Sequence, residues 1–183
     1  VIFLFGQISY CQSEFTLNKS HLDYLYKDIV IDGKQMAVIH IYSNAPDYKF
    51  VGDDDEGYAC VDDAARAAIF YLEYFKAYND SSSLYKYYNL VEFLLYMQSE
   101  NGFFYNFIWE DNSINKTFKT SVAEPNWWSY RALWALTEGY DFIIKSEGNR
   151  SSRVKQGISK IIESIKKNIP EEKNEVTIEG IKL

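Results

Sequence analysis

Four segments of the chain carry apolar residues at helical spacing, and this period constrains the fold more than any other feature. In the first, Val61, Ala64, Ala68 and Leu72 recur every three or four positions, which places them on one face of a helix. The third segment is apolar nearly all round and the fourth has a single apolar stripe, so we expect an inner and an outer helix respectively. The predicted helices cover residues 61–78, 84–98, 126–145 and 151–168.

Short turns would join these helices into pairs, and helical hairpins repeated around a ring build an α/α toroid. A β-hairpin is predicted around Asp32-Gly33, and residues 43–60 and 109–125 are expected to be loops. These long irregular loops, without a regular repeat, argue against a linear solenoid. We therefore predict a mainly all-α fold, an incomplete α/α toroid of helical hairpins with a small N-terminal β-hairpin. Residues 12–183 would form the N-terminal part of that domain, in a fragment of a longer chain.

Aromatic residues make up 17% of the 183 residues, with 16 Tyr and 4 Trp among them. Tyr and Trp combine a large apolar ring with a polar group, so this composition suits a helical core that also lines a wet cleft for a sugar. The alternative is that many Tyr side chains are simply half-buried on amphipathic helices. The formal net charge is −7, and no stripe of Lys and Arg alternates with aromatic residues. We expect an oligosaccharide or polysaccharide partner and no nucleic-acid partner.

The first eleven residues have the pattern of a signal-peptide remnant. Val1 to Ile8 form an apolar run that is too short to span a bilayer. Small residues at Ser9 and Cys11 would allow cleavage before Gln12. A lipid anchor on Cys11 and a buried β-strand are the alternatives. The chain is accordingly predicted to be secreted or periplasmic, either free or associated with the outer surface, and to lack a membrane span.

Neither the cysteines nor the histidines form a metal-binding pattern. Cys60 stands alone once Cys11 is removed, so we expect it to be a small buried apolar residue. His21 and His40 lack metal-ligand spacing to another His or Cys. The acidic run at residues 53–56 lacks the Gly and Glu positions of an EF-hand and is predicted to be a solvated loop. No metal and no cofactor are expected.

The first motif that could carry chemistry is GYACVDDAARA, residues 57–67. Asp62 and Asp63 stand at a helix start there, and Arg66 follows one turn later. One Asp could be a catalytic acid or base, or bind sugar hydroxyls, while Arg66 holds its partner ionised. The alternative is architectural, because acids favour the first turn of a helix and Asp62 and Arg66 form an i,i+4 pair.

The second motif, EPNWWSYR, opens the third long helix. Glu124 precedes Trp127 and Trp128, and Arg131 follows them. A Trp ring stacks on the apolar side of a pyranose while charged groups bind its hydroxyl edge, so this is the composition of a sugar subsite. The alternative is a capped core helix with Trp128 and Trp134 packed inside.

Three motifs in order, GYACVDDAARA, NGFFYNF and RALWAL, resemble the helical region found beside glycosyltransferase domains in some bacterial proteins. That region belongs with the six-hairpin (α/α)6 glycosidase-like toroids, so the resemblance implies a toroid over about residues 40–145. On matching positions, Asp62, Asp63 and Arg66 correspond to the family's DD…R pattern, and Arg131 corresponds to the Arg of its GRALWAL motif.

The chain departs from that family pattern at several positions. Glu124 corresponds to the Glu of the family's SED motif, but it lies seven positions before Arg131 and is followed by Pro125 instead of a second acid. Ala64 replaces an Asn, and one extra residue separates Tyr58 from the cysteine. If the second acid is catalytic in the family, its loss puts the chemistry of this chain in question.

From these motifs we predict a glycoside hydrolase-like enzyme that acts on an extracellular or periplasmic glycan. Inverting hydrolysis needs a general acid and a general base about 6.5–9.5 Å apart. Glu124 would be the acid, because Trp127 and Trp128 could desolvate it. Asp62 or Asp63 would be the base.

Three other functions are compatible with the sequence. A lyase or epimerase on sugar acids would use Arg66 and Arg131 to bind the substrate carboxylate and Tyr58 to move the proton. A non-catalytic glycan-binding module would keep the aromatic cleft without a working acid/base pair. A solenoid interaction protein is the fourth hypothesis.

Overall fold

The computed structural model describes residues 17–145, 149–169, 177–178 and 181–182. The helices are α1 (Ser20–Leu25), α2 (Val61–Tyr78), α3 (Ser81–Tyr96), α4 (Trp127–Glu138), α5 (Tyr140–Ile143) and α6 (Arg150–Asn168). The strands are β1 (Tyr26–Ile31), β2 (Lys34–Ile39), β3 (Tyr42–Asn44), β4 (Lys49–Val51), β5 (Ala59–Cys60), β6 (Phe107–Ile108), β7 (Thr177–Ile178) and β8 (Ile181–Lys182). The predicted signal-peptide remnant, residues 1–11, lies outside the described residues.

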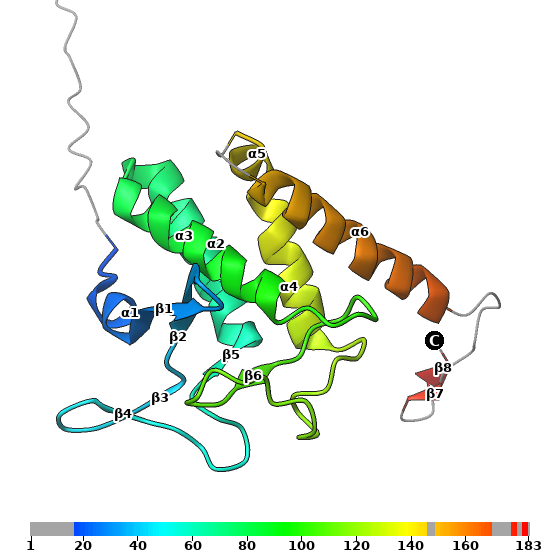
Figure 1. Ribbon diagram of the computed structural model, residues 1–183, viewed down its shortest axis with the longest axis horizontal. Coiled ribbons are helices and arrows are strands. Elements are labelled where there is room, and N and C mark those ends of the chain that lie inside the picture. The colour runs from blue at the N-terminus through cyan, green and yellow to red at the C-terminus, as the bar shows by residue number, and fades with distance from the viewer. Residues whose placement is uncertain (1–16, 146–148, 170–176, 179–180, 183) are drawn as a thin grey trace, which may run out of the picture.

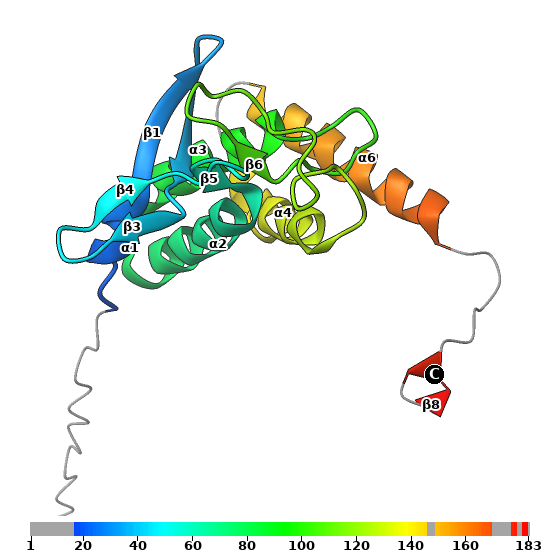
Figure 2. The same cartoon turned by 90° about the horizontal axis from the view of Figure 1, so that it is seen from below.

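Helices α2, α3 and α4 pack together, and α6 lies along the outer side of α4 (Figure 1). The β1–β2 hairpin packs against α3. Strands β3 to β6 and their long connections cover the end of the helices at which α2 and α4 begin, as Figures 1 and 2 show. The starts of α2 and α4 are therefore brought together beneath the same loops.

The prediction of a mainly all-α fold, an incomplete toroid, is wrong. About 50% of the described residues are helical and 19% lie in strands of small antiparallel sheets, so this is a mixed small α/β domain. Residues 43–60, which we expected to be loop, contain most of β3 and all of β4 and β5. Ala59 of β5 pairs with Ile108 of β6. Such distant pairing leaves no local period in the sequence, and this is why β5 was missed. Strands β3 and β4 pair locally, but each has only three residues, too few to show an alternating pattern.

The helix prediction over residues 61–78 is confirmed, because α2 has these bounds. The next helix begins at Ser81 rather than Leu84, since the Asp80 carboxylate accepts a hydrogen bond from the Ser82 N–H at 3.1 Å and caps it. The predicted helix over 126–145 is divided into α4 and the short α5, which meet at Gly139.

The predicted β-hairpin is also confirmed. Strands β1 and β2 pair antiparallel, and Asp32 and Gly33 at the turn have φ values of 50° and 73°. Two consecutive positive φ values are the geometry of a type I′ turn, whose twist matches that of paired strands.

The core holds much of the aromatic composition. Tyr71, Tyr87, Phe93 and Phe104 are fully buried, and the Tyr87 hydroxyl donates to the Ala135 carbonyl at 3.3 Å, which joins α3 to α4. None of the described helices is both long and apolar enough to cross a membrane.

Candidate functional site

Asp62 and Asp63 occupy the first turn of α2, and two neighbouring side chains fix the backbone there. The Cys60 Sγ atom accepts a hydrogen bond from the Asp63 N–H at 3.4 Å and caps the helix. The Asn106 side-chain oxygen accepts from the Asp62 N–H at 3.2 Å. Since Asn106 directly precedes β6, the β5–β6 pair and the helix start hold each other in place.

Two arginines bind these carboxylates. Arg66, one turn later on α2, donates from Nη2 to Asp62 Oδ2 at 3.3 Å and also to Asp63 Oδ1. Arg131 of α4 donates from Nη1 to Asp62 Oδ1. We call these four residues the Asp–Arg cluster. It joins α2 to α4, which supports the architectural reading of the first motif.

The Asp–Arg cluster has two negative and two positive groups, and both of its carboxylates accept hydrogen bonds from arginine. The Asp62 side chain is 15% exposed, and both of its oxygens already accept hydrogen bonds from guanidinium groups. By contrast, the side chains of Arg66 and Arg131 are 55% and 38% exposed. Each guanidinium carries five N–H donors, so the cluster presents donors to solvent. This arrangement can bind hydroxyl or carboxylate oxygens.

Three large rings stand on the solvent side of α4 next to the cluster. Trp127, Tyr130 and Trp134 are 58%, 44% and 53% exposed. They are spaced three and four residues apart, so they share one face of the helix. We call them the aromatic stripe. Arg131 is the residue after Tyr130 and lies at the edge of the same face.

Trp128 has a different role from its neighbour Trp127. It is 2% exposed, and its Nε1–H donates to the Phe104 carbonyl at 2.8 Å. Its ring meets the Trp127 ring edge to face, with centroids 5.2 Å apart. Trp128 is therefore a core residue that supports Trp127. The alternative reading of the second motif is right for Trp128 and wrong for Trp134, which is exposed.

Glu124 lies in another depression. That depression, about 410 Å³ in volume, is formed by the 101–103 turn, the 123–125 segment and the end of α6, and neither Asp62 nor Asp63 lines it. The Glu124 carbonyl accepts a hydrogen bond from Ser129 Oγ at 3.0 Å, which secures the start of α4. The structure thus brings Asp62, Asp63, Arg66 and Arg131 together, and Glu124 does not join them.

The remaining predicted residues and motifs are also placed elsewhere. Tyr58 lines a cavity on the β1–β4 side of the molecule. Cys60 is buried, and burial raises the pKa of its thiol well above the usual range. In the acidic run, Asp53 accepts hydrogen bonds from the Asp55 and Glu56 N–H groups, both at 2.9 Å, and thereby forms a turn. Among the described residues no group of three or more His, Cys, Asp or Glu could hold a metal ion.

Tyr130 and Trp134 are the surface aromatics that the sequence analysis did not assign to the site. Their signal was present, because Trp127, Tyr130 and Trp134 recur at i, i+3 and i+7. The same spacing also describes a buried face. Only the packing of α4, which buries Trp128, Ala132 and Leu136 instead, shows that these rings are exposed.

No protein-family model matches the sequence, and no curated protein matches it significantly. The resemblance to the six-hairpin glycosidase-like toroids therefore stays a prediction.

Proposed function

We propose that this protein binds carbohydrate through the aromatic stripe and the adjoining Asp–Arg cluster. The observation that carries the proposal is the exposure of Trp127, Tyr130 and Trp134 on one face of one helix. Large exposed apolar groups that lie together mark interaction sites. A sugar ring has an apolar C–H face that stacks on an aromatic ring, and a hydroxyl edge that the guanidinium groups of Arg66 and Arg131 can bind.

The spacing of the stripe favours an oligosaccharide or polysaccharide over a single sugar. Trp127 and Trp134 are seven residues apart, which is about 10.5 Å along a helix at 1.5 Å per residue. Rings at that separation can contact different sugar units of one glycan. The stripe lies on the exposed surface of a helix, so it suits a chain that passes over the surface.

The placement of the three predicted catalytic carboxylates favours binding over hydrolysis. Asp62 and Asp63 are bound by arginines, and Glu124 lines a different depression. Inverting hydrolysis requires a general acid and a general base in one site. The Asp–Arg cluster does not include Glu124, the predicted acid. An exported location, which depends on residues 1–11, would bring the stripe into contact with extracellular or periplasmic glycans.

The test is retention of the purified protein by a panel of soluble polysaccharides in affinity electrophoresis, followed by calorimetric titration with the best one. Trp127→Ala and Trp134→Ala should each weaken binding by about tenfold or more, since one lost ring contact forfeits about 1.4 kcal/mol. Tyr85→Ala is the matched control, because Tyr85 is 50% exposed on α3, away from the stripe.

Two outcomes would contradict the proposal. One is that no glycan retains the protein. The other is that the two Trp variants bind as tightly as Tyr85→Ala. Release of new reducing ends by the wild type, abolished by Glu124→Gln, would replace binding with hydrolysis as the function.

A further inference from the structure

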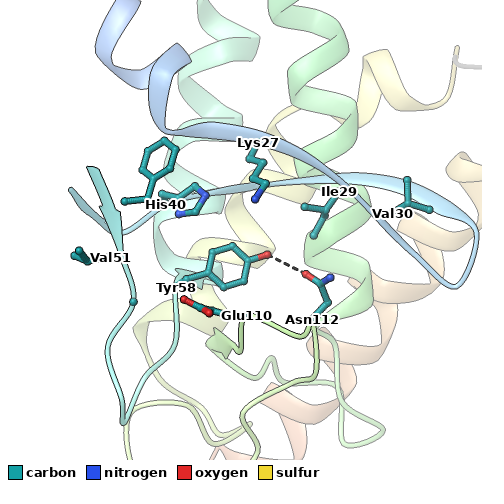
Figure 3. A pocket seen from close by; sticks show the side chains of 10 residues that line it. Lys27, Ile29, Val30, His40, Val51, Tyr58, Glu110 and Asn112 are labelled. Carbon is teal, nitrogen blue, oxygen red and sulfur yellow. Dashed lines mark hydrogen bonds between the residues drawn. The ribbon is translucent and has the colours of Figure 1, made fainter. Parts of the chain in front are cut away.

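A cavity of about 480 Å³ lies between β1, β4 and the loop after β6 (Figure 3). We call it the His40 cavity. Its volume falls within the range of about 300–1,000 Å³ that small-molecule sites occupy. None of the residues in the aromatic stripe or the Asp–Arg cluster lines it. Its polar lining residues are Lys27, His40, Tyr58, Glu110 and Asn112.

His40 is the least satisfied side chain in this cavity. It is 7% exposed, and neither Nδ1 nor Nε2 has a hydrogen-bond partner within the described chain. The Phe50 ring stacks on it with centroids 3.9 Å apart, and the Tyr58 ring lies 5.1 Å away. In Figure 3 the ring nitrogens lie on the side of Lys27 and Tyr58. Buried polar groups are normally paired, so a buried group with two unpaired nitrogens indicates a missing partner.

The cavity also holds two opposite charges that do not pair. Neither Lys27 nor Glu110 forms an ion pair with any described residue. Figure 3 shows them on opposite sides of the Tyr58 ring. The Tyr58 hydroxyl donates to the Asn112 side-chain oxygen at 3.0 Å. Burial and the nearby Glu110 raise the pKa of Tyr58 to about 12, so this hydroxyl stays protonated at neutral pH.

The imidazole is neutral under the same conditions. Burial lowers the pKa of His40, and the charge of Lys27 lowers it further. A neutral imidazole has one N–H donor and one acceptor nitrogen. One end of the cavity therefore offers an ammonium and an N–H donor, while the other end offers a carboxylate. Ile29 and Val51 add apolar wall between them.

We propose that the His40 cavity binds a small zwitterion with its charges at opposite ends, of the size of an ω-amino acid or a dipeptide. The ligand carboxylate lies against Lys27 and His40, its ammonium lies against Glu110, and its apolar body contacts the wall. This proposal does not depend on glycan binding by the aromatic stripe.

The experiment is calorimetric titration of the purified protein with four probes: 6-aminohexanoate, glycylleucine, hexanoate and hexylamine. Both zwitterions should bind about fivefold more tightly than the two singly charged probes, which each lose one exposed ion pair. Tighter binding of 6-aminohexanoate would indicate an amino-acid ligand, and tighter binding of glycylleucine would indicate a peptide ligand. Lys27→Met should abolish the preference over hexylamine, and Glu110→Gln the preference over hexanoate. Lys34→Met, in the β1–β2 turn region, should keep both preferences.

A second measurement needs no variant. In an NMR titration of His40, saturating 6-aminohexanoate should raise the pKa of the imidazole, because a carboxylate beside the ring stabilises its charged form. Equal affinity for all four probes, no binding by any of them, or binding without a change at His40 would each overturn the proposal. Trp127→Ala should leave these titrations unchanged, so failure here is separable from failure of glycan binding.

Discussion

Gly57 adopts a φ of 111° where the chain enters β5, and a Cβ atom added there would lie 2.2 Å from the Ile108 backbone oxygen. Gly33 also has a positive φ, 73°, but an added Cβ would meet nothing within 4 Å. A side chain at Gly33 would therefore cause backbone strain alone, whereas a side chain at Gly57 would cause both strain and steric overlap. Ile108 is the residue with which Ala59 pairs, so overlap at Gly57 pushes β5 away from β6.

We predict that Gly33→Ala lowers the free energy of unfolding by about 1–2 kcal/mol, the cost of a left-handed residue with a side chain. Gly57→Ala should lower it by at least about 3 kcal/mol, because strain and overlap with backbone add. Urea denaturation of both variants measures the difference. Equal losses would mean that β5 and β6 can separate at little cost.

The residues of the candidate site divide into those that sequence could identify and those that needed the fold. Asp62 and Arg66 lie one turn apart on a helix, and Trp127 stands in a motif of unusual composition, so each has a local signal. The link from Arg131 to Asp62 has none, since it depends on α2 and α4 starting side by side. The His40 cavity is similar, because β1, β4 and the loop after β6 supply its walls.

At the scale of elements, α6 is held to the rest of the molecule by an apolar contact, by hydrogen bonds to the 98–101 segment, and by one charged residue of α3. Only Val154, Gly157 and Ile161 of α6 are buried. Glu92 of α3, whose side chain is 8% exposed, accepts hydrogen bonds from Arg150 at 2.9 Å and from Arg153. Since the arginines are only 24% and 31% exposed, loss of the Glu92 charge leaves two partly buried cations unpaired.

Glu92→Gln should loosen α6 selectively. We expect hydrogen exchange over residues 150–168 to accelerate about tenfold, because a broken, partly buried ion pair costs about 1–2 kcal/mol, less than a fully buried one. Helices α2 and α3 should keep their protection. Glu73→Gln is the control, since Glu73 is 53% exposed in its pair with Lys76. Uniform acceleration over the whole chain would show that α6 does not open separately.

Elements with a local period were predictable, whereas very short strands and strands formed by distant pairing were not. The α2 bounds and the β1–β2 turn follow from short-range patterns, namely apolar spacing and the Asp32-Gly33 dipeptide. The pairing of β5 with β6 joins segments almost fifty residues apart, and no short-range pattern in the sequence signals it. The helical pattern gave the helices correctly, but it could not show that strands and loops, rather than further hairpins, cover their ends.

At the scale of the whole molecule, Asp23 joins three helices. It stands on α1, accepts from the Tyr71 hydroxyl of α2 at 2.9 Å and from Lys86 of α3 at 2.5 Å, and pairs with Lys19 at 3.0 Å. Burial disfavours its ionised form, but the hydrogen bonds from Lys86, Lys19 and Tyr71 outweigh burial and lower the pKa of Asp23. The unfolded chain consequently takes up this proton at a higher pH than the folded protein does.

The difference in the pKa of Asp23 between the folded and unfolded chain determines how the free energy of unfolding changes in acid. The stabilisation from Asp23 is complete above the unfolded pKa, about 4, and is lost as the pH falls through the lower folded value. Asp23→Asn should therefore reduce the free energy of unfolding at pH 7 and flatten its decline below about pH 4. Asp54→Asn, in the exposed acidic run, should change neither. Urea unfolding at a series of pH values measures both quantities. If Asp23→Asn loses stability at pH 7 but keeps the wild-type decline in acid, the three-helix junction is held by packing, and its charge contributes little.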